Sequence, residues 1–322
     1  MRTLTNLAAV TFAFALCLLA PHDAWSQSGR TIKLLVPAAP GASTDFVARL
    51  SADHISRTQG VTAIVENRPG ANGMIGVEQV SRAAPDGNTL LVTANTYLLD
   101  DLLRKPNYHP VTSFEPVCFL VQTPAVLLVH AESPYRTLKD LLDAARAKPG
   151  ELSLAAVGPG STFQLGMIAL TRKAGINMIY VPYAGSAPAV TALLGKHVTA
   201  AISGYAVVVE HVKAGKLRAL ASGTAKRIEP EPNLPTFDES GFKGMEIDNF
   251  FGVAAPAKTP KDTITQLSSW FTAALQAPES KAKLAAQYLY TGGPCGADYG
   301  AYLRSRHDEY GKTIRDAKIT VQ

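Results

Sequence analysis

The sequence predicts an α/β protein of about two domains, built on a mainly parallel sheet covered by helices. The chain has 322 residues, of which 47% are hydrophobic and 18% charged, so it has ample apolar material for a large core. Short apolar runs alternate with helical patterns along its length, as in folds where a helix follows each strand. No low-complexity linker separates the two sheet-forming blocks, which indicates two lobes joined by strands that pass between them.

The first block begins with a predicted strand at Thr31–Val36, followed by a helix within residues 44–56. A second strand is expected from Val61, then a glycine-rich turn and a helix from about Ile75. A third strand is expected within residues 87–94.

The second block repeats this order after Val121. Its strands are expected within residues 125–131, 152–157, 178–183, 198–204 and 217–223. Helices are expected between them, one of them ended by Pro149 and Gly150. Three more helices are predicted near the end of the chain, at about Lys261–Gln276, Pro278–Tyr288 and Ala297–Lys312.

The N-terminus is typical of a secretory signal peptide covering residues 1–26. Arg2 precedes an apolar run from Leu7 to Ala20, and small residues near Ser26 mark the expected cleavage point. The alternative is an N-terminal membrane anchor, for which the apolar run is short. The mature protein is therefore expected in the periplasm.

Two cysteines remain after the signal peptide, Cys118 and Cys295. In an exported protein they could form a disulfide or remain two separate buried thiols, and the sequence leaves both open. Neither their spacing nor that of the seven histidines matches a metal site, so no metal and no cofactor are expected. The net charge of +5 is dispersed, so no nucleic-acid partner is expected.

Three segments share the order apolar strand, small-residue loop, helix: Val36–Asp45, Val157–Gln164 and Val181–Val190. In open α/β sheets ligands bind beyond the carboxyl ends of the strands. There the following helix presents unpaired N–H groups and the positive end of its dipole. We expect these loops to face one another and to hold an anion.

Patterns of known catalytic sites are missing. The segment "GPGST" is not a nucleophile elbow, and no loop ends in the Gly-Lys-Ser/Thr of a phosphate-binding P-loop. A hydrolase using Ser161 or Ser203 is an alternative, but neither serine has an identifiable base. The chain is therefore not expected to be an enzyme.

Several segments, taken in order, carry a family resemblance: "VPAAPGASTDFVARL", "VENRPGANGMIG", "APDGNTLL", "VPYAGSAPAVTALLGKHV", "GKLRALA" and "LPTFDESG". With them, nearly the whole mature chain resembles the solute receptors of tripartite tricarboxylate transporters, the TctC or Bug family. The resemblance implies a periplasmic-binding-protein fold, type II-like, in which two α/β lobes joined by two crossover strands close on a ligand like a Venus flytrap.

The resemblance also implies the domain bounds. The first lobe would be discontinuous, made of residues 27–123 and 248–322, and the second lobe would cover 124–247. The chain would cross between them near Gln122–Pro124 and near Asn249–Phe251.

Carried over residue by residue, the resemblance implies ligand contacts from both lobes. They fall on Pro40, Gly41, Ala42, Ser43 and Asp45 in the first lobe, and on Gly160, Ser161, Thr162, Gln164, Tyr183, Ala184, Gly185 and Ser203 in the second. An isolated carboxylate would repel an anion, so Asp45 is expected to hold waters or backbone donors rather than touch the ligand. Arg68 is expected to tie the glycine-rich turn down, with Gly70, Gly73 and Gly76 allowing close packing.

The implied function is a periplasmic, monomeric receptor that captures a small carboxylate for the membrane permease subunits of such a transporter. Gln164 replaces a frequent histidine and Ser203 a frequent acid, which favours a di- or tricarboxylate or an aromatic acid over an amino acid. The alternative is a ligand-sensing subunit of a signalling system with the same pocket.

Overall fold

The computed structural model describes residues 29–158 and 160–319, so the predicted signal peptide lies outside the described residues. The strands are β1 (Thr31–Val36), β2 (Thr62–Asn67), β3 (Thr89–Ala94), β4 (Phe114–His130), β5 (Ser153–Val157), β6 (Ile179–Tyr183), β7 (Ala200–Gly204), β8 (Leu217–Ser222) and β9 (Asp248–Pro256). The helices are α2 (Ser43–Gln59), η1 (Ala71–Gly73), α3 (Met74–Ser81), α4 (Thr96–Arg104), α5 (Leu138–Ala147), α6 (Thr162–Ala174), α7 (Ser186–Leu194), α8 (Tyr205–Lys213), α9 (Lys261–Gln276), α10 (Pro278–Ala286) and α11 (Gly296–Ala317).

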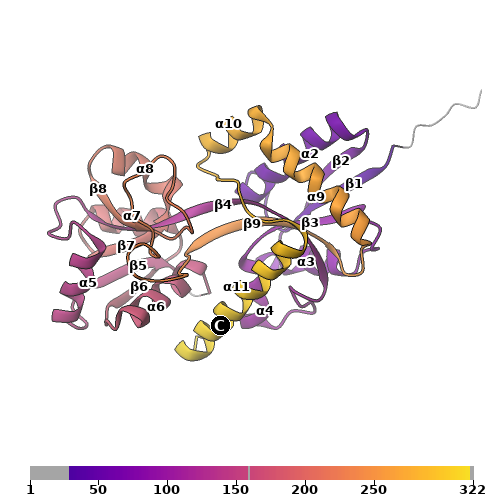
Figure 1. The fold of residues 1–322 in the computed structure, drawn as a ribbon. Coiled ribbons are helices and arrows are strands. Elements are labelled where there is room, and N and C mark those ends of the chain that lie inside the picture. Colours follow the sequence, from indigo (N-terminus) through magenta and orange to yellow (C-terminus); the bar gives the residue numbers. More distant parts are fainter. Residues whose placement is uncertain (1–28, 159, 320–322) are drawn as a thin grey trace, which may run out of the picture.

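The strands pair in the order β2-β1-β3-β9-β4-β7-β5-β6, with β8 also on β4. Strands β1, β2 and β3 are parallel, as are β5, β6 and β7, while β9 runs antiparallel to β3. The first part of β4 pairs with β9, and its last part pairs with β7 and β8. Figure 1 shows β4 and β9 side by side between two groups of elements. The first lobe holds β1–β3 with α2–α4 and α9–α11, and the second holds β5–β8 with α5–α8.

Each lobe is packed on both faces of its sheet. In the first lobe, Leu34 of β1 contacts the core under α2 and α9, while Leu35 contacts the core under α3, α4 and α11. In the second lobe, Leu127 and Leu128 of β4 divide in the same way between the α5–α6 core and the α7–α8 core. Strands buried on both faces are apolar at successive positions, which is why these runs do not alternate with polar residues.

The strongest departure from the sequence prediction is β4. It is one 17-residue strand through both lobes, whereas only its second half, residues 125–131, is predicted as a strand. Pro116 and Pro124 argue against a strand in the first half, because proline is rare inside strands. Pro116 lies beside a register shift in the ladder with β9, and Pro124 lies where β4 leaves β9 and begins to pair with β7. The nine-residue helix α4 was also not predicted.

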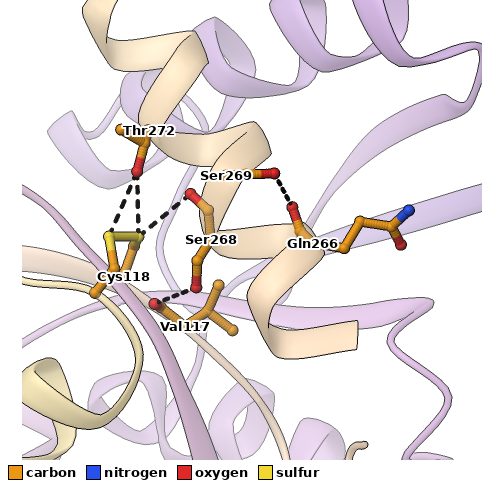
Figure 2. Close-up of a disulfide and its surroundings, with 7 residues drawn as sticks. Val117, Cys118, Gln266, Ser268, Ser269 and Thr272 are labelled. Carbon is orange, nitrogen blue, oxygen red and sulfur yellow. Dashed lines mark hydrogen bonds between the residues drawn. A yellow bond between two sulfur atoms is a disulfide. The ribbon is translucent and has the colours of Figure 1, made fainter. Parts of the chain in front are cut away.

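Cys118 and Cys295 form a disulfide, which decides between the two alternatives left open by the sequence. The bond joins β4 to the segment that leads into α11. Figure 2 shows it beside α9, with the hydroxyl oxygen of Thr272 3.5 Å from the sulfur of Cys295. The Ser268 hydroxyl of the same helix donates to the carbonyl of Val117 at 2.9 Å, so α9 is fixed to β4 next to the bond.

Candidate functional site

The three small-residue loops lie at the carboxyl ends of β1, β5 and β6, each followed by the start of a helix. The loop after β1 belongs to the first lobe, and the other two belong to the second. Parallel β5 and β6 end at the same edge of their sheet, so their loops are neighbours. The amide of Gly158 donates to the carbonyl of Tyr183 at 2.9 Å and ties these two loops together.

The start of α2 presents unused donors. Its N-cap residue is Ala42, whose side chain cannot accept a hydrogen bond. The first amide of the helix with a backbone partner is that of Phe46, which donates to the Ala42 carbonyl at 2.9 Å. Within the described residues, the amides of Ser43, Thr44 and Asp45 donate to no acceptor. An uncapped helix start of this kind is an anion-binding feature.

The Asp45 carboxylate is buried and turned toward its own loop. It accepts hydrogen bonds from the Gly41 amide, the Arg49 guanidinium and the Asn67 side-chain amide, each at 2.9 Å. Burial alone would raise the pKa of Asp45, but the bonds from Arg49, Gly41 and Asn67 outweigh it and hold that pKa below its ordinary value. The acid is therefore charged at neutral pH and compensated from within the protein, as expected of a residue that holds backbone donors.

Asn67, at the end of β2, holds the first loop in place. Its side-chain amide donates to the Ala38 carbonyl at 3.1 Å as well as to Asp45, whereas the Arg68 side chain pairs with Glu66 on the exposed surface. The Arg68 side chain was expected to hold the glycine-rich turn, but among the described residues it pairs with Glu66, at the end of β2, and with no residue of the turn that follows. Gly73 has the expected role, since its φ is 92° and an added Cβ would lie 2.9 Å from the Pro37 carbonyl oxygen.

The second loop repeats the arrangement of the first. The amide of Gly160 donates to the side-chain carbonyl of Gln164 at 2.9 Å, as that of Gly41 donates to Asp45. In both cases the third helical residue bonds the glycine four positions earlier. The shared pattern is Pro-Gly, three residues, then Asp or Gln, a signal present in the sequence but overlooked. Each lobe therefore holds its loop by the same hydrogen bond, which is accepted by a charged carboxylate in the first lobe and by a neutral amide oxygen in the second.

Three of the predicted hydroxyl-bearing residues of the second lobe already donate hydrogen bonds within the protein. Ser161 caps α6: its hydroxyl oxygen accepts from the Gln164 amide at 3.1 Å, and its O–H donates to the Val157 carbonyl at 2.9 Å. Thr162 donates to the side chain of Asn249 on β9 at 2.9 Å, a contact from α6 to a crossing strand. Ser203 is fully buried and donates to the Gly204 carbonyl. Among the described residues, neither serine hydroxyl forms a hydrogen bond with a basic side chain.

The third loop, with Tyr183, Ala184 and Gly185, leads into α7. Its N-cap residue Gly185 provides no side-chain cap, and Ala184 is exposed. The first amide of α7 with a backbone partner is that of Ala189, which donates to the Gly185 carbonyl. The second lobe therefore also has an uncapped helix start at this edge.

A small cavity of about 60 Å³ adjoins the first loop. It is lined by Pro37, Ala38, Thr44, Asn72, Gly73, Val77, Thr93, Ala94, Thr96, Tyr97 and Asp100. Asn72 has φ 59° and donates to the Asp100 carboxylate at 2.8 Å, while burial raises the pKa of that carboxyl. A non-glycine residue at positive φ is a strained feature that is common at functional sites. These polar lining residues were missed, because the glycine-rich segment predicts a turn but not what the turn encloses.

Two α/β lobes, two crossing strands and loops with free amide donors define a solute-binding protein of the periplasmic-binding-protein fold. The model of the tripartite tricarboxylate transporter family receptor, TctC, matches residues 47–315. The chain belongs to this family, which confirms the resemblance seen in the sequence. The family is one of solute receptors rather than enzymes.

Relatives agree with this assignment. Protein BugT of Bordetella pertussis is 35% identical over 273 residues, covering 83% of each chain. A TctC solute-binding protein from Polaromonas, solved without ligand, is 28% identical with a TM-score of 0.84, covering 90% of this chain and 99% of that one. R. palustris Rpa4515 with adipate is 31% identical with a TM-score of 0.70, covering 92% and 99%. MatC of Rhodopseudomonas palustris with malate is 26% identical with a TM-score of 0.67, covering 88% and 99%.

Among the described residues, none of the helices combines the length and the apolar character needed to span a bilayer.

Proposed function

We propose that the protein is a periplasmic receptor that binds a small dicarboxylate between its lobes. The observation that carries this proposal is the start of α2, where three consecutive amides have no acceptor within the described residues and the nearest acid is already compensated. A carboxylate placed there would gain charge-assisted bonds and the favourable end of the helix dipole.

The lack of basic residues in the loops supports recognition of the ligand carboxylates by backbone amides. The loop segments 37–45, 158–164 and 183–187 contain no lysine or arginine. The donors for an anion are therefore amides at helix starts, one set in each lobe. A ligand with a carboxylate at each end would satisfy both sets at once, and adipate and malate, bound to two neighbours in the family, are of this kind. Aromatic acids and tricarboxylates are the alternative ligands, and their affinities should be compared with that of a dicarboxylate.

The proposed lobe bounds are residues 27–123 with 248–322, and 124–247. The chain would bend where β4 and β9 cross, near Gln122–Pro124 and Asn249–Phe251. The structure is more similar to the ligand-free Polaromonas protein than to the two ligand-bound neighbours, with TM-scores of 0.84 against 0.70 and 0.67, at similar identities. This difference supports an open conformation that closes on the ligand.

The loop residues of both lobes, including Ala184, form the proposed binding site, and the buried Ser203 lies next to it at the carboxyl end of β7. After export the loaded receptor would deliver its ligand to the membrane permease subunits of a tripartite transporter, acting as a monomer.

Isothermal titration of the mature protein with malate, adipate, citrate and benzoate tests the proposal. We expect one ligand per chain, with a dicarboxylate the tightest. Aspartate serves as the comparison, because its extra ammonium would find no acid among the exposed loop residues. A folded protein that binds none of the acids would overturn the proposal.

A further inference from the structure

Two histidines and an aspartate that belong to none of the three loops converge on the surface of the first lobe. They are Asp101 of α4, His109 of the loop that follows, and His307 of α11. One ligand atom from each lies within 4.8 Å of the other two. Asp101 and His307 are half-buried and His109 is exposed, so the cluster is open to solvent on one side.

The side chains are already oriented toward one another. The Nε2 atom of His307 lies 2.8 Å from a carboxylate oxygen of Asp101. The rings of His109 and His307 are 5.3 Å apart between centroids and tilted by 55°. The His109 backbone is fixed, because its amide donates to the Ser113 hydroxyl at 3.0 Å and its carbonyl accepts from the Ser113 amide at 2.9 Å. Only a small side-chain movement is therefore needed to bring the three ligand atoms to one centre.

This donor set suits zinc. Imidazole nitrogen and carboxylate oxygen bind Zn²⁺ at about 2.0–2.2 Å, so ligand atoms around a tetrahedral ion are roughly 3.4 Å apart. This value lies within the range found in the cluster, where the closest two ligand atoms are 2.8 Å apart and no two are more than 4.8 Å apart. Two histidines and one carboxylate leave a fourth position for water.

Two existing hydrogen bonds would be given up, and the one between His307 Nε2 and Asp101 would be replaced by the bonds of both atoms to the metal. The Nδ1 atom of His109 accepts a hydrogen bond from the Val111 amide at 3.2 Å. A neutral imidazole has a single lone pair, so whichever ring nitrogen binds the metal, this bond is lost. The cost is small, because the loop is exposed and the Val111 amide can bond to water instead.

We propose that Asp101, His109 and His307 form a Zn²⁺ site that clamps α11 to α4. Helix α11 also contacts α6 of the second lobe, where Arg172 pairs with Asp316. The metal would therefore stabilise the helix through which the lobes touch, without reaching the ligand loops.

Titration of Zn²⁺ into the full mature chain, without an affinity tag and treated with chelator, tests the site. We expect one Zn²⁺ per chain and a rise in unfolding temperature that grows with metal concentration. His109→Ala and His307→Ala should each weaken binding by more than about 100-fold, beyond the loss typical of an outer ligand partner. Asp101→Asn should weaken it in the same direction.

His197→Ala is the matched control, because His197 is exposed in the second lobe and its loss should leave Zn²⁺ binding unchanged. Substitution with Co²⁺ gives a readout independent of stability, since its visible spectrum reports nitrogen ligation and coordination number. Wild type that binds no Zn²⁺, or three variants that bind it as tightly as the wild type, would overturn the proposal.

Discussion

At the residue scale, Asp45 shows how an acid can stand beside a proposed anion site. Its charge is matched by an amide, a guanidinium and a carboxamide, and its position fixes the loop that carries the donors. The carboxylate is part of the support for the site, and its removal should act on ligand binding through the loop.

Asp45→Ala should therefore lower both stability and affinity. It leaves the Gly41 amide and the Asn67 side chain without their acceptor, at a cost of about 1–3 kcal/mol in the free energy of unfolding. Urea unfolding and titration with the tightest dicarboxylate measure the two effects. The control is Asp53→Ala on the same helix, which removes only an exposed pair with Arg57 and should change stability by less than about 0.5 kcal/mol. Equal effects of the two variants would contradict the assigned role.

Asp248 should make the free energy of unfolding fall as pH rises. Asp45, whose pKa is lowered, should act in the opposite sense. Asp248 is buried where β9 re-enters the first lobe, and within the described residues its carboxylate oxygens accept no hydrogen bond. Burial raises its pKa from 3.8 to about 7, although Arg306, 3.7 Å away, opposes the rise. Between these values the folded protein holds a proton that the unfolded chain has lost. The stabilisation that comes from protonated Asp248 is therefore fully present below pH 3.8 and is lost as pH rises through about 7.

Asp248→Asn removes that titration while keeping the shape of the protonated acid. The stability of the variant relative to wild type should increase by more than about 1 kcal/mol between roughly pH 5 and pH 8. Urea unfolding at the two pH values measures it. A difference that does not vary with pH would show that Asp248 is ionised throughout.

At the element scale, the parallel strands and most helices follow from the sequence, because each strand is a short apolar run and each helix has apolar residues at helical spacing. Strand β4 does not, since its two prolines lie beside a register shift with β9 and at the change of partner from β9 to β7. The loops were located from strand-to-helix transitions, but their internal bonds depend on contacts between distant residues. Asn67 lies 22 residues from Asp45, and Thr162 lies 87 from Asn249, so neither contact has a local signal.

The disulfide between β4 and the start of α11 should stabilise the first lobe. It joins residues separated by 177 positions, and the chain between them contains the whole second lobe. Replacing both Cys118 and Cys295 with serine should lower the free energy of unfolding by about 2–4 kcal/mol. Ligand affinity should be unchanged, because the bond joins β4 to the segment before α11 and neither cysteine belongs to a loop of the proposed site. Reducing agent should destabilise wild type to the same extent and leave the double variant unaffected.

At the scale of the whole molecule, two lobes connected through β4 and β9 can change their separation with little change inside either core. Solution X-ray scattering should show a smaller radius of gyration when the tightest dicarboxylate is added. A protein that binds the ligand with an unchanged radius of gyration would contradict lobe closure.

The central claim is that backbone amides at the start of α2 bind the ligand carboxylate. Ser43→Pro tests it most directly, because proline fits the first helical position and Ala42 already has the extended conformation that suits a residue before proline. The change removes one amide donor, and Ser43→Ala separates the loss of the hydroxyl from that of the amide. Lys261→Pro makes the same change at the first position of α9, remote from the loops.

Titration with the tightest dicarboxylate should show that Ser43→Pro binds at least about tenfold more weakly than wild type, the loss expected for one hydrogen bond to a charged group. Ser43→Ala and Lys261→Pro should bind much as wild type does, and circular dichroism should show all three variants folded. If folded Ser43→Pro binds as tightly as wild type, the start of α2 does not hold the carboxylate.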